Sequence, residues 1–194
     1  MSSEFTSKTI WTPANIVTCI RIFFIPVFYI LMLFEFPVAA AIVFSLLAAT
    51  DWLDGYLARS RNEVTNFGKF MDPIADKLLV LAALLALIEL GSLPSWIALV
   101  IITREFLVSG LRMLAASQGH VIAASKIGKA KTATTLLALI FFILKESKYI
   151  MINPSVFQVF IILAWLLMIV AVVLTLYSMY DYFKKSAHFL FEVN

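Results

Sequence analysis

The sequence has little cysteine and little charge, and each shortage excludes a class of protein. A single cysteine, Cys19, excludes an internal disulfide and any cysteine-rich metal site. It lies in an apolar run beside Ile20, so we interpret it as a small buried hydrophobic residue. Only 14% of the residues are charged and 62% are hydrophobic, whereas about a quarter of a soluble domain is charged. One soluble core cannot hide this apolar excess, which predicts an integral membrane protein.

Long apolar runs recur along the chain, each long enough to cross about 30 Å of hydrocarbon as a helix of about 20 residues. Proline and glycine interrupt the pattern at Phe36-Pro37, at residues 91–94 and at Asn153-Pro154. Each span must be helical because lipid offers the backbone no hydrogen-bond partner. We expect Pro73 in the first turn of the third helix. The predicted fold is all-α, with six transmembrane helices at about residues 15–33, 37–59, 68–89 (starting between 68 and 72), 94–117, 129–144 and 154–182.

The basic residues outside the spans lie mostly on one side of the membrane. Only Lys145 and Lys148 fall on the other side. Because basic loops face the cytoplasm, we expect both termini there, which requires an even number of spans. The basic side would hold Lys8, Arg59, Arg61, Lys69, Lys126, Lys129, Lys131, Lys184 and Lys185.

The first residues, 1–13, are too short and polar to cross the membrane, so a surface-lying helix and a disordered segment are both open. Residues 1–8 lack the basic start and apolar core of a signal peptide, so we expect no cleavable leader. Residues 1–194 are interpreted as a single membrane domain.

Four aspartates lie in or beside two apolar spans, where an ionised side chain is costly and seldom without a role. Asp51 and Asp54 are three residues apart on one helix face. Asp72 and Asp76 are four apart and also share a face. The short polar loop 60–67 makes the two helices antiparallel neighbours, so both pairs meet near the cytoplasmic surface. Four clustered carboxylates need protons or cations, and oxygen ligands without nearby histidine or cysteine favour two Mg²⁺ or Mn²⁺ ions.

Small residues accompany the first acidic pair. Gly55 and Ala58 extend the face of Asp51 and Asp54 by another turn. Such residues leave a slot where a flat or bulky group can approach the backbone. The alternative is that they only let two membrane helices pack closely. Beside two carboxylates we favour the slot.

The pattern D-x-x-D-G-x-x-A-R, then eight residues, then G-x-x-x-D-x-x-x-D resembles the signature of the CDP-alcohol phosphotransferase family. Every fixed position is present: Asp51, Asp54, Gly55, Ala58, Arg59, Gly68, Asp72 and Asp76. Eight residue types at fixed spacing form a far more specific signal than a lone glycine motif. The six-span layout also fits, so the resemblance covers nearly the whole chain.

What the resemblance implies is a specific chemistry. Members of that family bind a CDP-linked donor at the cytoplasmic membrane face, hold two divalent cations with the motif aspartates and usually form homodimers. The implied metal ligands are Asp51, Asp54, Asp72 and Asp76. The last of these, Asp76, is also implied as the base that deprotonates the acceptor hydroxyl. The implied donor-binding residues are Gly55, Ala58, Arg59 and Gly68, with Arg59 near the nucleotide or paired with a motif carboxylate.

Basic residues further along the chain indicate the acceptor alcohol. Arg104 and Arg112 are eight residues apart on the fourth span and fall on nearly the same face. A basic cluster beside an acidic metal site favours an acceptor that carries its own phosphate. For Arg104 the alternative is equally open that it and Glu105 neutralise partners inside the bundle. The candidate ligands of the acceptor phosphate are Arg104, Arg112, Lys126, Lys129 and Lys131.

Residues 13–21, 104–112 and 128–132 are similar to those of the phosphatidylglycerophosphate synthases, a group within that family that uses sn-glycerol 3-phosphate. The resemblance implies a multi-pass enzyme of the cytoplasmic (plasma) membrane that transfers the phosphatidyl group of CDP-diacylglycerol to sn-glycerol 3-phosphate and releases CMP, in phospholipid biosynthesis. The first alternative is the same donor with inositol phosphate, serine or phosphatidylglycerol as acceptor. The second is a cation transporter, although a transport path would distribute acids across the membrane depth. No nucleic-acid partner is expected.

Overall fold

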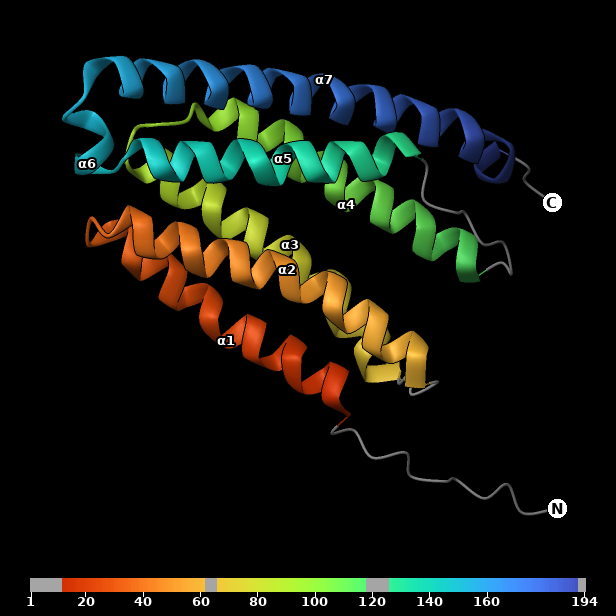
Figure 1. Cartoon of the computed structure of the whole chain (residues 1–194). Coiled ribbons are helices and arrows are strands. Elements are labelled where there is room, and N and C mark those ends of the chain that lie inside the picture. The colour runs from red at the N-terminus through yellow and green to blue at the C-terminus, as the bar shows by residue number, and fades with distance from the viewer. Residues whose placement is uncertain (1–11, 62–65, 118–125, 192–194) are drawn as a thin grey trace, which may run out of the picture. The chain divides into compact units, whose positions relative to one another are not determined.

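The computed structural model describes residues 12–61, 66–117 and 126–191, and in this part of the chain every element of secondary structure is a helix (Figure 1). This confirms the predicted all-α fold. The N-terminal segment, for which we left a surface helix and disorder open, lies outside the described residues except for its last two positions. The helices are α1 (Pro13–Leu33), α2 (Pro37–Arg61), α3 (Asn66–Glu89), α4 (Ser95–Ser117), α5 (Lys126–Lys145), α6 (Lys148–Met151) and α7 (Pro154–Phe191).

The helices begin and end where the sequence places capping and breaking residues. The Thr12 hydroxyl caps α1 by accepting a hydrogen bond from the Asn15 N–H at 3.3 Å, and proline follows the cap at the first helical position. At the end of α3, Gly91 has a φ of 67°, the left-handed conformation that closes a helix. There the Ser92 N–H donates to the Leu87 carbonyl at 2.9 Å. The helices are interrupted at each of the predicted breaks: Phe36-Pro37, residues 91–94 and Asn153-Pro154.

Two details of the prediction were wrong. Helix α3 begins at Asn66, before the predicted start, so Pro73 lies inside the helix and not in its first turn. A membrane helix tolerates an internal proline because neighbouring groups can satisfy the backbone carbonyl that it leaves without a partner. The four-residue helix α6 was not predicted, because one turn carries no periodic signal.

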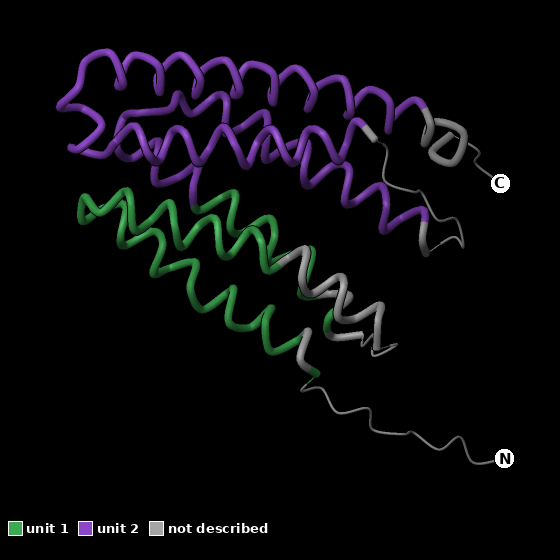
Figure 2. The backbone as a smooth tube through the Cα atoms, viewed as in Figure 1, with its two compact units in different colours: residues 1–82 green, residues 83–194 purple. Residues whose placement is uncertain are grey.

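The chain forms two compact units, residues 1–82 and 83–194, whose division falls within α3 (Figure 2). In the first unit, α1 and α2 run antiparallel and pack along their length. The rings of Phe28 and Phe44 are 5.4 Å apart, and both side chains are fully buried. Aromatic pairs at this distance stabilise packing beyond the area they bury. Apolar packing around Phe28 and Phe44 therefore holds α1 against α2.

The second unit is built on α7, which packs against both α5 and α4. Phe142 and Trp165 meet edge to face at 5.3 Å between ring centroids, and Phe141 and Phe160 lie 5.4 Å apart. The connection before α4 is tied to the end of α5 by Lys145, whose ammonium donates to Ser92 Oγ at 2.9 Å and to Glu146 Oε1 at 2.7 Å. The second unit thus has an aromatic core with a polar tie at one end.

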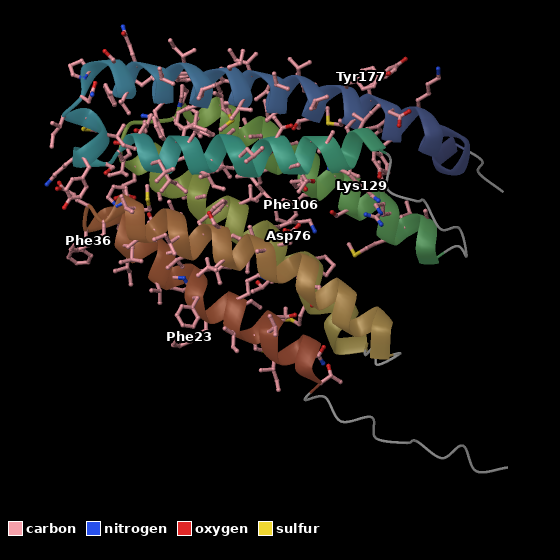
Figure 3. The ribbon with its side chains drawn as sticks, viewed as in Figure 1. Phe23, Phe36, Asp76, Phe106, Lys129 and Tyr177 are labelled. Atoms are coloured by element: carbon pink, nitrogen blue, oxygen red, sulfur yellow. The ribbon has the colours of Figure 1, made fainter. Side chains whose placement is uncertain are left out.

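Three helices of the described part are long and apolar enough to span a membrane: Asn15–Leu33, Ile127–Lys145 and Pro154–Lys184. Apolar side chains also cover the outside of the helices. Phe23, Phe36 and Tyr177 are 72%, 60% and 57% exposed and point away from the ribbon (Figure 3). Such exposure is expected for side chains in contact with lipid and not with water. The chain is a membrane protein, and the count of six spans stays a prediction.

Candidate active site

The described part of the acidic motif lies on α3. Asp72 and Asp76 are one turn apart on this helix, and both side chains are partly buried (Figure 3 labels Asp76). Gly68 precedes them by one turn and is buried. Beyond them the same side of α3 becomes apolar, with Leu79 and Ala83 at most 1% exposed. The carboxylates therefore lie on the packed side of α3, towards the beginning of the helix.

Helix α1 contacts this acidic segment. The Thr18 hydroxyl donates a hydrogen bond to Asp72 Oδ1 at 2.6 Å, which joins residues 54 positions apart. Three residues further along α1, Arg21 Nε donates to Thr50 Oγ1 at 3.2 Å. Thr50 comes directly before Asp51 in α2. Polar groups of α1 thus reach both helices that carry the motif.

The rest of the motif occupies the last turns of α2. The backbone there is helical up to Arg61, so Asp51 and Asp54 have the predicted helical spacing. The side chains of five motif residues lie outside the described part of the structure: Asp51, Asp54, Gly55, Ala58 and Arg59. The predicted meeting of the two carboxylate pairs therefore stays a prediction.

A second polar group lies in the other unit, where the fourth-span arginine meets a lysine from α5. Arg104 donates from Nη1 to Glu105 Oε1 at 3.0 Å, and the Lys131 ammonium donates to the same carboxylate oxygen. The second guanidinium nitrogen, Nη2, donates to Ser178 Oγ on α7 at 2.6 Å. The ring of Tyr182 lies 5.7 Å from the guanidinium carbon, a cation–π distance. One carboxylate thus links cations from α4 and α5, and Arg104 carries the link on to α7.

This buried group contains two cations and one carboxylate. Arg104 is 7% exposed and Lys131 is 3% exposed. Within the described part of the chain, Nε of Arg104 is buried without a hydrogen-bond partner. A buried donor without a partner costs about 1–3 kcal/mol, so an added acceptor atom would be stabilising. Arg104 and Glu105 thus have charged partners inside the bundle, as one of our two interpretations expected, and the charges of these three side chains sum to one positive charge. The binding of the acceptor phosphate by Arg104 stays a prediction.

The other candidate acceptor ligands differ in their surroundings. Arg112 on α4 and Lys129 on α5 are exposed, and Lys129 is labelled in Figure 3. Lys126 is the first residue of α5, and its side chain lies outside the described part. Of the predicted acceptor residues whose side chains are described, Arg104 and Lys131 form a buried pair held by Glu105, and Arg112 and Lys129 lie at the surface.

Sequence reasoning gave no role to Thr18, Arg21 and Ser178. A signal was present for the first two, because Asn15, Thr18 and Arg21 repeat every three residues inside an apolar span. A polar stripe of this kind on a membrane helix indicates a packed polar face. No comparable signal marks Ser178, whose partner Arg104 is 74 positions away.

The family model described as CDP-alcohol phosphatidyltransferase matches residues 11–177. The chain therefore belongs to the CDP-alcohol phosphatidyltransferase family, whose members generally depend on divalent metal ions.

Curated relatives match most of the length of the chain. The chain is 42% identical over 187 residues to a CDP-diacylglycerol–glycerol-3-phosphate 3-phosphatidyltransferase of Bacillus subtilis, covering 89% of this chain and 93% of the relative. Proteins of the same name from Pseudomonas fluorescens and Escherichia coli K12 are each 39% identical. These matches cover 89% and 84% of this chain, and 88% and 86% of the respective relatives.

Proposed function

We propose that the protein transfers the phosphatidyl group of CDP-diacylglycerol to sn-glycerol 3-phosphate, giving phosphatidylglycerophosphate and CMP. The observation that carries the proposal is the unbroken eight-position motif from Asp51 to Asp76, inside the region that the family model matches. The relatives that bear this activity in their names match along most of both chains, which supports the same donor and acceptor.

The proposed metal site uses all four motif aspartates. Asp72 and Asp76 fit a hard divalent cation, because they present carboxylate oxygens from one face of α3 and are only partly exposed. Asp51 and Asp54 would complete an oxygen-only ligand set for two Mg²⁺ or Mn²⁺ ions. When bound, such ions neutralise the pyrophosphate of the donor and the charge that develops during transfer.

Two further groups of motif residues would bind and activate the substrates. Asp76 would accept the proton of the acceptor hydroxyl as its oxygen attacks the lipid-bearing phosphorus, and the bond from that phosphorus to CMP then breaks. Arg59 would lie near the nucleotide. The proposed donor site consists of Gly55, Ala58, Arg59 and Gly68, where the small residues admit the cytidine.

The phosphate of the acceptor would bind to the basic residues of α4 and α5. Charge-assisted hydrogen bonds to a phosphate are roughly twice as strong as neutral ones. The buried group of Arg104, Glu105 and Lys131 carries a net positive charge, and its Arg104 Nε is a donor without a partner in the described residues. The exposed cations Arg112 and Lys129, together with Lys126, would add further donors. This excess of positive charge favours a phosphate-bearing acceptor over serine.

The proposal extends to the setting of the enzyme. The family model runs across both compact units, so we propose that residues 1–194 act as one membrane domain. The distribution of basic residues supports a multi-pass protein of the cytoplasmic membrane, with both termini and the site on the cytoplasmic side. A homodimer is the expected assembly.

The test is CMP release by the purified protein in nanodiscs with CDP-diacylglycerol and Mg²⁺. Sn-glycerol 3-phosphate, serine, inositol phosphate and phosphatidylglycerol are supplied in separate reactions, and the lipid product is identified by mass spectrometry. We expect release only with sn-glycerol 3-phosphate. The Asp54→Asn variant, prepared in the same way, is the matched inactive control. Release with another acceptor would refute the proposed acceptor, and no release with any acceptor would refute the activity.

A further inference from the structure

The buried face of α1 changes character halfway along the helix. Spacings of three and four residues place these side chains on one stripe. Its first half is polar and its second half apolar, yet every member is at most 8% exposed: Asn15, Thr18, Arg21, Ile25, Phe28 and Met32. Burying polar groups in a membrane protein is costly unless they are bonded. The polar half of α1 therefore has a role that the apolar half does not share.

Arg21 fastens α1 to α2 next to the acidic motif. Its guanidinium is 1% exposed and donates through Nε to Thr50 Oγ1 at 3.2 Å. The Thr50 hydroxyl in turn donates to the Leu47 carbonyl at 2.7 Å, within the turn of α2 directly before Asp51. Further along the two helices, the rings of Phe28 and Phe44 are in contact. Helix α1 is thus held at two levels and cannot slide along α2.

Thr18 lies about one turn before Arg21 on α1 and bonds to the motif itself. Its hydroxyl, which is fully buried, donates to Asp72 Oδ1 at 2.6 Å. A donor fixed in this way selects one rotamer of the carboxylate. It engages one oxygen, and in the described part of the chain no hydrogen bond reaches the other oxygen, Oδ2. Partners of metal-ligating side chains act in this manner, because they orient the ligand before the ion arrives.

We propose that Thr18 is a positioning residue that fixes the Asp72 carboxylate for metal binding, with Arg21 holding α1 so that the Thr18 hydroxyl stays aimed at it. The inference rests on the proposed function only in taking Asp72 as a metal ligand. Without the hydroxyl, Asp72 would rotate among several rotamers, and the ion would bind only to the fraction in the correct one.

The test measures Mn²⁺ affinity directly, without substrate, from the signal of free Mn²⁺ in electron paramagnetic resonance of the full chain in nanodiscs. Thr18→Val keeps the shape and removes the hydroxyl, so we expect affinity to fall about 10–100-fold. Thr18→Ser keeps a donor and should lose much less. The matched control is Thr175→Val, because Thr175 is also fully buried but donates to the Ala171 carbonyl of its own helix at 2.6 Å. This control should bind Mn²⁺ as the parent does.

Two outcomes would overturn the inference: parent-like Mn²⁺ affinity in Thr18→Val, or equal losses in Thr18→Val and Thr18→Ser. If Thr18→Val does not fold, Thr18→Ala can replace it, because alanine also lacks the hydroxyl and is smaller than threonine, so it fits without a clash. CMP release on the same preparations separates this inference from the proposed function. If the unsubstituted protein showed no turnover while Thr18→Val still weakened Mn²⁺ binding, only the proposed function would be refuted. If the unsubstituted protein turned over and Thr18→Val bound Mn²⁺ with normal affinity, only the positioning role would be refuted.

Discussion

The carboxylate of Glu105 pairs with two cations at once, so its replacement by glutamine should destabilise the second unit. The Arg104 and Lys131 side chains are 8% and 4% exposed, whereas Glu105 is 20% exposed. Removing the charged partner of buried ions typically costs about 3–5 kcal/mol. Glutamine retains an oxygen that accepts hydrogen bonds, so we take the lower end, about 3 kcal/mol. At roughly 2–4 °C per kcal/mol for a chain of this size, the melting temperature should fall by about 6–12 °C.

The assay is thermal unfolding of the purified protein in one detergent, followed by the fluorescence of its tryptophans. Glu89→Gln, the same chemical change at an exposed position at the end of α3, is the matched control. Substitutions at such positions usually change stability by less than about 0.5 kcal/mol, so its melting temperature should hardly move.

A double variant shows whether charge is the cause. Adding Lys131→Met to Glu105→Gln removes one of the two uncompensated cations and leaves an apolar stem of similar length. We therefore expect the double variant to melt above Glu105→Gln. Two results would show that the carboxylate does not balance these cations. One is a melting temperature of Glu105→Gln equal to that of the parent. The other is a double variant whose loss in melting temperature equals the sum of the losses of Glu105→Gln and Lys131→Met measured separately.

Three predictions concern the acidic motif. Removing divalent cations with a chelator should abolish CMP release and adding Mg²⁺ or Mn²⁺ should restore it; full turnover in metal-free buffer would end the two-metal proposal. Gly55→Leu should accumulate in membranes yet fail to bind CDP-diacylglycerol, and normal turnover would reduce Gly55 to a packing residue. Asp76→Asn should bind donor and Mn²⁺ within several-fold of the parent while turnover falls about 10²–10⁴-fold. A parallel loss of donor binding in that variant would make Asp76 a metal ligand only.

The helices could be predicted because membrane spans are long and their interruptions are chemically distinct. Proline and glycine mark the breaks before α2, α4 and α7, and all three occur where the sequence places them. The start of α3 was harder to predict, because a proline is typical of the first turn of a helix, whereas α3 begins at Asn66 and continues through Pro73. Whether a helix continues through a proline depends on the groups that pack around it, which the local sequence does not determine.

The candidate site could be predicted in its residue types but not in its pairings. The spacing of Asp72 and Asp76 depends on a single helix, and local geometry determines it. The partners of Lys131 and Arg104 come from other helices, 26 and 74 positions away. Contacts of this kind depend on how helices pack, so the sequence could list the basic residues without showing that Glu105 joins two of them.

The positions of polar and apolar residues along α1 and α3 also distinguish an enzyme from a transporter. On α3 the partly buried acids Asp72 and Asp76 give way to fully buried Leu79, Ala83 and Leu87. The stripe of α1 changes in the same way, from polar residues at its start to Phe28 and Met32 near its end. A cation path would need polar ligands along the whole depth of these helices, because an ion in an apolar stretch loses its hydration without replacement. Polar groups confined to one half of these helices instead fit the proposed site near one membrane surface, with packed apolar side chains further along the helices. Such a site suits a reaction on a lipid head group, whose acyl chains stay in the bilayer.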